Sequence, residues 1–329
     1  MTGGCGFIAS NLIRYMLEQN RDIKITNVDS LSIGANPSNL KEIKREPRYR
    51  FVKGDIANPS LVNRLVKNVD AIINVAAETH VDRSIANPKP FLRSNTIGTF
   101  TILESVRKIN PKVKVVHVST DEIYGDIPEG SFNEDSRLKP SNPYAAAKAA
   151  ADLFALAYHR TYGLDVSITR CTNNFGPYQS PEKLIPKTII RARRGLSVPI
   201  YGKGEQVRDW IYVLDHCEAL TAVLDRGKAG EIYNVSAGKM VSSIDVVTSI
   251  LELLGKPRDL VQFVEDRPGH DVRYSLDSSK IRSRLGWKPR YSFAEALKGT
   301  VKWYLENESW WKPQASEKML HPTPWKLKW

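Results

Sequence analysis

Apolar runs alternate with segments of helical periodicity through the first half of the chain. The run Val113–Val118 contains four valines, which is typical of a buried parallel strand. Further strands are expected at Ile23–Asp29, Tyr49–Asp55, Asp70–Ala76 and Val166–Cys171. Because strands and helical segments alternate, the pattern predicts an α/β fold: a doubly wound parallel sheet with helices on both faces.

Helical periodicity predicts the elements between and after these strands. In the first half, helices are expected from the glycine-rich start to about Gln19, at Phe91–Lys108 and at Pro143–Tyr162. After Asn173 the segments become shorter and richer in Pro, Gly and aromatic residues. Expected there are helices at about Glu182–Arg194, Val213–Asp225 and Ser243–Leu254, and short strands at Glu231–Val235 and Leu260–Val264.

This change of texture predicts two domains. The first covers residues 1–172, with returns at about 207–235 and 292–306. The second is a smaller mixed α/β domain made of about 173–206, 236–291 and the 307–329 tail, and it is expected to close over the carboxyl edge of the sheet. The tail from Trp310 contains four tryptophans and three prolines, so it is expected to pack on the body or on a neighbouring subunit.

Composition describes an ordinary globular chain of 329 residues with 41% hydrophobic and 26% charged residues. No apolar run approaches the roughly 20 residues that span a bilayer, and no secretory signal opens the sequence, so no membrane association is expected. Three scattered cysteines favour a reducing, cytoplasmic setting and predict no metal site. The net charge of +12 is spread among acids without a nucleic-acid-binding motif, and it favours an anionic small substrate over a nucleic acid.

Residues 2–9, Thr-Gly-Gly-Cys-Gly-Phe-Ile-Ala, predict a phosphate-binding turn. Gly3 and Gly6 allow a backbone approach to a pyrophosphate at the start of a helix that includes Phe7 and Ile8. Asp29 ends the next strand 20 residues after Ala9, where a carboxylate suits the ribose of NAD rather than NADP. Asp55 and Ile56, at the end of the following strand, are expected beside the adenine.

The strand that should precede this glycine turn is absent, because the sequence opens at Met1-Thr2. A doubly wound sheet without that strand leaves the edges of its neighbours unpaired. We expect a start upstream of this Met or a shortened chain rather than a new architecture.

Two polar groups in the middle of the chain are candidates for catalysis. Residues 119–125, Ser-Thr-Asp-Glu-Ile-Tyr-Gly, follow a strand, and ligands collect at the carboxyl ends of such strands. Tyr144 and Lys148 are four residues apart at the start of a helix, so they share a face, and the lysine can lower the pKa of the phenol. Taken alone, the first group is equally typical of a solvated turn, and the second of a surface pair.

In combination these motifs resemble the extended short-chain dehydrogenase/reductase superfamily, with its Rossmann-type fold. Within it, the chain is similar nearly end to end to the nucleoside-diphosphate-glucose 4,6-dehydratases, above all to those that act on dTDP-glucose. The stretches that carry this resemblance are Thr2–Ile8, Ala76–Ser84, Ser119–Gly125, Asn173–Gln179, Glu182–Pro186, Tyr201–Trp210 and Asp266–Tyr274.

The resemblance implies NAD as the cofactor and a three-step reaction in deoxysugar biosynthesis, such as rhamnose formation. Tyr144, assisted by Thr120 and Lys148, takes the proton of the glucose C4 hydroxyl while hydride leaves C4. Glu122 then removes the C5 proton, a protonated Asp121 releases the C6 hydroxyl as water, and hydride returns to C6. Adjacent acids with opposite roles require environments that separate their pKa values.

The resemblance also implies the remaining site residues and a homodimer. The NAD site would include Ala76 and Ala77 as well as Tyr144 and Lys148. Residues expected along the sugar-nucleotide path are His80, Ser84, Asn174, Lys183, Leu184, Pro186, Tyr201, Arg208, Arg267, His270 and Tyr274. For Arg208 and Arg267, pairing with the adjacent Asp209 and Asp266 stays open, as does a loop-capping role for His80. The helices Phe91–Lys108 and Pro143–Tyr162 are the expected dimer contact.

Several related functions stay open at this point. A UDP-glucose 4,6-dehydratase differs only in the nucleotide, which the sequence does not identify. A nucleotide-sugar 4-epimerase needs no Asp-Glu pair, and a UDP-glucuronate decarboxylase leaves Asp121 unexplained. A non-catalytic NAD-binding protein does not require Thr120, Tyr144 and Lys148 together. The Asp121-Glu122 pair therefore favours a hydro-lyase.

Overall fold

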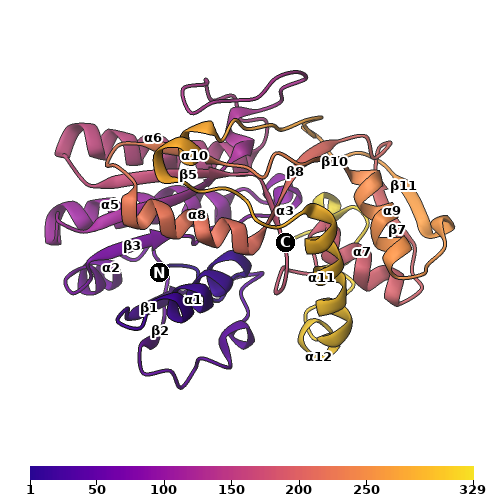
Figure 1. The fold of residues 1–329 in the computed structure, drawn as a ribbon, viewed down its shortest axis with the longest axis horizontal. Coiled ribbons are helices and arrows are strands. Elements are labelled where there is room, and N and C mark those ends of the chain that lie inside the picture. The colour runs from indigo at the N-terminus through magenta and orange to yellow at the C-terminus, as the bar shows by residue number, and fades with distance from the viewer.

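A computed structural model describes all residues, 1–329, and shows two domains side by side (Figure 1). The strands are β1 (Ile25–Asp29), β2 (Tyr49–Lys53), β3 (Ala71–Asn74), β4 (Lys114–Thr120), β5 (Val166–Cys171), β6 (Asn173–Phe175), β7 (Val198–Tyr201), β8 (Val207–Tyr212), β9 (Ile232–Val235), β10 (Met240–Ser242) and β11 (Val261–Val264). The helices are α1 (Phe7–Gln19), α2 (Pro59–Val66), α3 (Val81–Ala86), α4 (Lys89–Phe91), α5 (Gly98–Ile109), α6 (Pro143–Tyr162), α7 (Leu184–Arg193), α8 (Val213–Arg226), α9 (Ser243–Leu253), α10 (Ser279–Leu285), α11 (Phe293–Glu306) and α12 (Glu308–Trp311). Short helical turns are η1 (Pro37–Leu40), η2 (Leu92–Ile97), η3 (Asp121–Tyr124), η4 (Arg258–Leu260) and η5 (Pro324–Lys326).

The larger domain is built on parallel strands, as the sequence predicts. One sheet has the order β3-β4-β5-β9, and β1 pairs with β2 beside it. Apolar side chains of α1 and α8 cover one face, and those of α2, α5 and α6 cover the other. Because both faces of β4 are covered, its residues Val115–Thr120 are all buried, and its polar carboxyl end is delivered to the interior.

The sheet is interrupted between β1 and β3, where the absent first strand is expected. Only the first residues of the chain join the two parts: Thr2 bridges Val28 and Asn74, and the Gly3 amide donates to the Val28 carbonyl at 2.8 Å. An apolar cavity lined by residues that include Ile56, Ile72 and Ile102 lies beside this junction. These few bonds lie at the carboxyl end of the sheet, so they still position the glycine turn.

Helix α6 has the bounds that its sequence predicts, because local signals define both ends. Asn142 is the N-cap and accepts from the Ala145 amide at 2.9 Å, and Pro143 occupies the first helical position. Gly163, with φ of 69°, ends the helix in the left-handed conformation. The predicted helix at Phe91–Lys108 is instead assembled from α4, the π-helical turn η2 and α5.

The smaller domain contains two short sheets. Strand β8 pairs with β10 and β6, and β7 pairs with β11. Its core gathers α7, α9 and α11, including Ile189, Val246 and Val301. This packing differs from the expected return of residues 292–306 to the first domain, because the apolar stripe of α11 faces α7 and α9.

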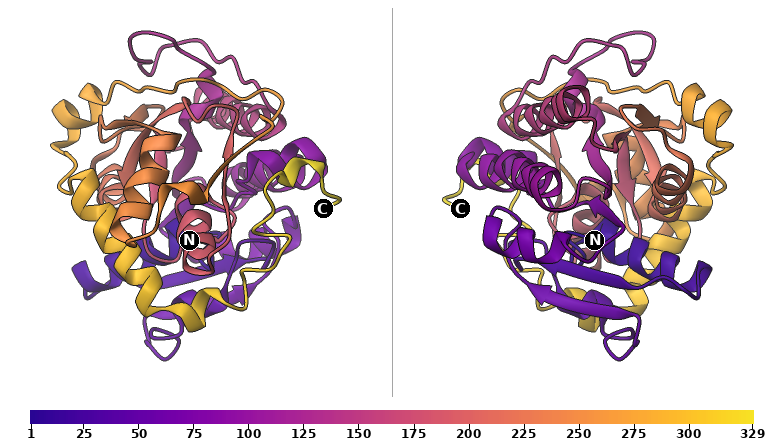
Figure 2. Two further views of the ribbon diagram at one scale, coloured as in Figure 1. Left: turned by 90° about the vertical axis from the view of Figure 1, so that its right-hand side faces the viewer. Right: turned by 90° about the vertical axis from the view of Figure 1, so that its left-hand side faces the viewer.

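The C-terminal tail runs from the smaller domain back across the molecule to the larger one (Figure 2). Its turn η5 packs against α3, and Trp311, Leu320 and Trp325 are buried. The tail therefore packs on the body of the protein and spans both domains. No helix in the structure is both long enough and apolar enough to cross a lipid bilayer.

Candidate active site

The glycine turn comes close to the end of β3. A Cβ atom on Gly3, whose φ is +67°, would lie 2.7 Å from the Cα of Ala76, so only glycine fits there. The Thr2 hydroxyl accepts from the amides of Val75 and Ala76, both at 3.1 Å, and locks the turn onto that strand end. Helix α1 begins at Phe7 with no side-chain cap, so its first amides are available to a phosphate.

A cleft above this turn collects the residues expected to hold NAD. It is lined by Gly3, Gly6, Phe7, Ile8, Asp29, Asp55, Ile56, Ala76 and Ala77. The close backbone approach at Gly3 and the uncapped start of α1 fit a dinucleotide. Tyr144 and Lys148 line an adjoining cavity that shares Phe7, Ile8 and Ala77 with the cleft.

The two acids of this cleft differ in their surroundings. Asp29 is buried and accepts from the amides of Cys5 at 2.9 Å and Leu31 at 2.7 Å, while burial raises its pKa. Asp55 is more exposed and accepts two bonds from Arg93, at 3.0 and 2.8 Å. Asp29 is thus held rigidly beside the glycine turn, as a ribose ligand needs.

In the strand-end group at β4, Thr120 and Asp121 are buried and Glu122 is half-buried. The Thr120 hydroxyl donates to Oδ1 of Asp121 at 3.0 Å and accepts from the Glu122 amide at 3.4 Å, which starts η3. The other carboxyl oxygen of Asp121 is buried without a partner. Thr120, Asp121 and Glu122 line the same cavity as Tyr144 and Lys148. The interpretation as a solvated turn therefore does not hold.

Burial and charge place the two acids in different electrostatic environments. Burial, followed by the charge of Glu122, raises the pKa of Asp121 to about 8, so this carboxyl carries a proton at neutral pH. Burial also raises the pKa of Glu122, but Arg267, Lys183 and Arg208 oppose that shift. Asp121 is thus suited to donate a proton and Glu122 to accept one.

Tyr144 and Lys148 are both buried on one face of α6. Burial and the charge of Glu122 raise the pKa of Tyr144 well above 10, so the expected lowering of that pKa by Lys148 is not found. Burial lowers the pKa of Lys148 to about 8, and its Nζ donates to the Val118 carbonyl at 2.5 Å. The positive charge of Lys148 alone does not offset the cost of burying an ionised Tyr144 next to the carboxylate of Glu122.

A buried polar network next to Lys148 is not predicted from the sequence. Asp152, one turn after Lys148, accepts from Nε of Arg170 at 2.9 Å and lies 3.4 Å from Nε2 of His117. Nδ1 of His117 lies 3.2 Å from the Asn74 amide, whose oxygen accepts from the Thr2 hydroxyl at 2.7 Å. The network links the glycine turn to α6. The i, i+4 spacing of Lys148 and Asp152 is the one signal that the sequence contains.

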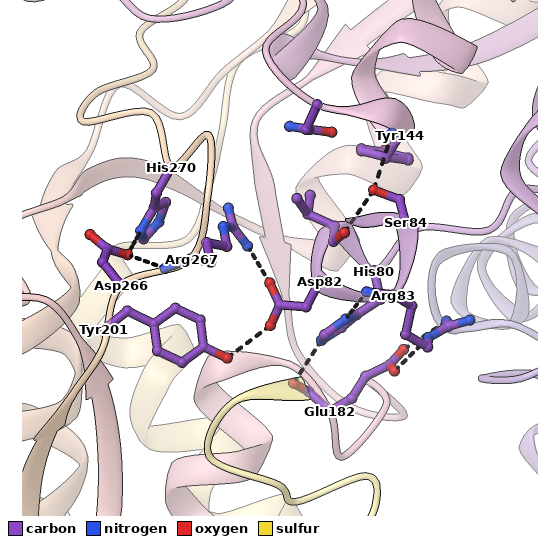
Figure 3. Close-up of polar contacts among 12 residues, drawn as sticks. His80, Asp82, Arg83, Ser84, Tyr144, Glu182, Tyr201, Asp266, Arg267 and His270 are labelled. Atoms are coloured by element: carbon purple, nitrogen blue, oxygen red, sulfur yellow. Dashed lines mark hydrogen bonds and ion pairs between the residues drawn. The ribbon is translucent and has the colours of Figure 1, made fainter. Parts of the chain in front are cut away.

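A second cavity, between the domains, collects most residues expected to bind the sugar nucleotide. It is lined by His80, Lys183, Leu184, Tyr201, Arg208, Arg267, His270 and Tyr274, together with Glu122. Asn174 lines the neighbouring catalytic cavity. Ser84 and Pro186 line neither: Ser84 accepts from the Tyr144 amide at 3.2 Å (Figure 3), and Pro186 is buried within α7.

The two arginines do not pair with their neighbours in sequence. Arg208 donates to the carbonyls of Val207, Asp271 and Val272, and its guanidinium lies 4.3 Å from the centre of the Tyr274 ring. The Arg267 side chain pairs with Asp82 at 2.9 Å rather than with Asp266, which contacts His270 instead (Figure 3).

His80 does cap a helix. Its Nδ1 accepts from the Arg83 amide at 3.4 Å, and its Nε2 lies 3.3 Å from the Glu182 carbonyl. Burial lowers its pKa to about 4, so the ring is neutral at pH 7. Arg83 in turn bridges Glu78 and Glu182, at 2.7 and 3.0 Å. This buried cluster, also missed from the sequence, joins α3 to the start of α7.

Comparisons with known proteins agree with this geometry. Residues 1–300 match the family model described as GDP-mannose 4,6 dehydratase. A dTDP-glucose 4,6-dehydratase of Streptomyces niveus is 48% identical over 320 residues, which are 96% of this chain and 95% of that protein. Crystalline DesIV, a dTDP-glucose 4,6-dehydratase from Streptomyces venezuelae with NAD bound, is 48% identical with a TM-score of 0.93, over 95% of this chain and 98% of that one. A UDP-glucuronic acid 4-epimerase from Bacillus cereus is 25% identical with a TM-score of 0.88, over 93% and 98%.

Proposed function

The chain belongs to the GDP-mannose 4,6-dehydratase family, and from this membership we propose that it converts dTDP-glucose to dTDP-4-keto-6-deoxyglucose with NAD as its cofactor. The observation that carries the proposal is the pair of adjacent acids, the buried Asp121 and the half-buried Glu122, which share one cavity with Tyr144. An epimerase has no leaving group at C6 and does not need a buried carboxyl that keeps its proton to about pH 8.

Three residues carry the oxidation in this proposal. Thr120 and Tyr144 hold the C4 hydroxyl of glucose, and Tyr144 takes its proton. Lys148, fixed by the Val118 carbonyl, holds a positive charge beside the phenolate that Tyr144 needs to become. NAD, which the glycine turn and Asp29 would hold, would supply the hydride acceptor for C4 and the hydride donor for C6. The high pKa of Tyr144 means that this positive charge alone does not ionise it, so the phenol has to release its own proton to solvent before it accepts the proton of the C4 hydroxyl.

The elimination uses the two acids. The C4 ketone acidifies the C5 proton, and Glu122 removes it and gives a proton back to C5 when hydride is added at C6. The protonated Asp121 gives its proton to the C6 hydroxyl, which departs as water. The proton that Glu122 gains and the proton that Asp121 loses leave the net charge of the pair unchanged. This balance matters, because burying even a neutral polar group without a hydrogen bond costs about 2–7 kcal/mol. An additional negative charge in a buried site costs more than that.

Incubation with dTDP-glucose and, separately, with UDP-glucose tests the function. We expect a 4-keto-6-deoxy product from dTDP-glucose, detected by mass spectrometry as a loss of one water, with NAD regenerated. Turnover of UDP-glucose alone would reassign the nucleotide. Interconversion of C4 epimers, or loss of carbon dioxide from UDP-glucuronate, would contradict the dehydratase proposal.

We also propose that two copies pair through α5 and α6. Exposed apolar side chains gather on these helices, among them Phe100, Leu153 and Phe154. Phe100 and Phe154 contact edge to face, with ring centroids 5.6 Å apart, so the two helices form one continuous patch. Such a patch supports a helical dimer contact between identical faces.

The mass in solution tests the dimer. We expect twice the chain mass by light scattering and a shift to the monomer for Leu153→Lys, which places a charge in the centre of the patch. Phe263→Lys is the matched control, because Phe263 is equally exposed at 59% but lies on β11. A monomeric mass for the unchanged protein would contradict the proposal.

We propose that NAD binds the domain formed by residues 1–172 and 213–235, rather than 207–235, because β8 pairs with β10 and β6 of the smaller domain. The sugar nucleotide is assigned to the smaller domain. The NAD cleft and the substrate cavity adjoin each other, since Lys183 lines both. Two adjoining cavities support the binding of one ligand by each domain. The three cysteines are unpaired and buried, which suits a reducing cytoplasm, where nucleotide sugars would be the partners rather than membranes or nucleic acids.

A further inference from the structure

Asp82 has no part in the reaction as derived so far, yet it is a buried acid inside the cavity between the domains. It lies in the first turn of α3, directly after the loop that follows β3, and its residue is 2% exposed. It lines the cavity that contains Arg208 and Arg267. A buried carboxylate in a cavity meant for an anion is unfavourable unless it acts on something else there.

The partners of Asp82 come from the opposite domain. Its Oδ1 accepts from Arg267 at 2.9 Å, and its Oδ2 accepts from the Tyr201 hydroxyl at 2.8 Å (Figure 3). Tyr201 ends β7, and Arg267 follows β11, the strand that pairs with β7. One carboxylate on the larger domain therefore holds two neighbouring side chains of the smaller domain.

The two candidate diphosphate ligands are oriented by different means. Three backbone carbonyls hold the guanidinium of Arg208, so the local chain fixes its direction. The guanidinium of Arg267 has Asp82 as its only hydrogen-bond acceptor, and its buried Nε has no partner. Arginine binds a phosphate well only when its planar fork is held in the right orientation. The direction of that fork depends on Asp82.

The surrounding charges keep Asp82 ionised. Burial favours the neutral acid, but Arg267, which also donates a hydrogen bond to it, and Lys187 hold its pKa well below the ordinary value. Lys187 and Arg267 both carry charge beside it, so the cluster retains an excess positive charge after Asp82 is counted. An incoming diphosphate therefore meets a net positive site in which Asp82 does not cancel the attraction.

We propose that Asp82 is a positioning residue that aims Arg267 at the diphosphate, and that it sets the preference of the site for a nucleoside diphosphate over the nucleoside. Asp82 acts through Arg267 and does not touch the substrate. This inference rests on the proposed function, since it takes the cavity between the domains as the site of the sugar nucleotide.

The test compares two ligands that differ only in the diphosphate. For Asp82→Asn in the NAD-loaded protein we expect the Kd for dTDP to rise about 10- to 100-fold, the loss typical of one charge-assisted contact. The Kd for thymidine, the NAD content and the melting temperature should stay unchanged. With dTDP-glucose, KM should rise by a similar factor. The value of kcat should change by less than about 3-fold, because Asp82 does not contact the reacting atoms.

Two further variants show whether the effect passes through Arg267. In an Arg267→Ala background, Asp82→Asn should weaken dTDP binding no further, because the group that it orients is gone. Asp82→Glu keeps the charge and should restore most of the affinity, and it also serves if Asp82→Asn does not fold. Asp215→Asn is the matched control: Asp215 is equally buried in the first turn of α8 and accepts from the Arg290 amide at 2.8 Å, outside the substrate cavity.

Three results would overturn the proposal. Unchanged or tighter dTDP binding by Asp82→Asn would mean that Asp82 is idle or competes with the diphosphate. Equal losses for thymidine and dTDP, or a lower melting temperature with loss of NAD, would mean a purely structural role. An additional loss in the Arg267→Ala background would mean that Asp82 acts by another route. Failure of the unchanged protein to bind dTDP at all would instead contradict the proposed function.

Discussion

Glu122→Gln is expected to leave the protein able to oxidise C4 of dTDP-glucose but unable to eliminate water. Glutamine has nearly the shape of glutamate and keeps the hydrogen bond with Asn142 possible, but it does not accept the C5 proton. General-base catalysis typically contributes about 10²- to 10⁴-fold, so the dehydration rate should fall by at least 10²-fold. Tyr144, Thr120 and Lys148 are unaltered, so hydride transfer from C4 should continue.

Rapid mixing with one equivalent of dTDP-glucose measures this prediction. The absorbance of reduced nicotinamide should rise and persist, while mass spectrometry finds no loss of water. Glu129→Gln, an exposed residue of the loop that follows η3, is the control and should behave as the unchanged protein. Dehydration at the normal rate by Glu122→Gln would remove the base role from this residue. Loss of the absorbance signal as well would show that Glu122 serves the oxidation, not only the elimination.

Asp121→Asn should stop the same reaction one step later. Glu122 can still remove the C5 proton, so solvent deuterium should enter the sugar at C5. The C6 hydroxyl has no proton donor in this variant, so water loss should fall by about 10²-fold or more. Deuterium uptake without dehydration, followed by mass spectrometry in heavy water, distinguishes this variant from Glu122→Gln, in which both should be lost. Uptake lost in Asp121→Asn and kept in Glu122→Gln would reverse the two roles.

The pH dependence provides a second measure of Asp121. Because its pKa is about 8, the proton-donating form is present below pH 8, and the dehydration rate should fall about tenfold per pH unit above that value. The ordinary pKa of 3.8 applies in the unfolded chain, so the native state binds this proton more tightly. The contribution of Asp121 to the free energy of unfolding is therefore fully present below pH 3.8 and is lost as the pH rises to about 8. Asp121→Asn should remove that slope.

Much of the fold is predictable because its signals are local. The bounds of α6 follow from Asn142, Pro143 and Gly163, which cap a helix whatever surrounds it. Strand β5 has the predicted bounds, and β4 starts one residue later than predicted. The strands β6, β7, β8 and β10 were not predicted, because they gain their stability from pairing with distant segments.

The sequence by itself determined the α/β architecture, the glycine turn at Gly3 and Gly6, and the approach of Thr120, Asp121 and Glu122 to one edge of the sheet. Periodicity and strand direction are properties of neighbouring residues, so these features need no knowledge of distant contacts. Only the tertiary structure decided which acid keeps its proton and how the arginines are aimed. Those outcomes depend on burial and on contacts such as Asp82–Arg267, between residues 185 positions apart in the chain. Charges interact through space, and their energies depend on which groups the folded chain leaves without water.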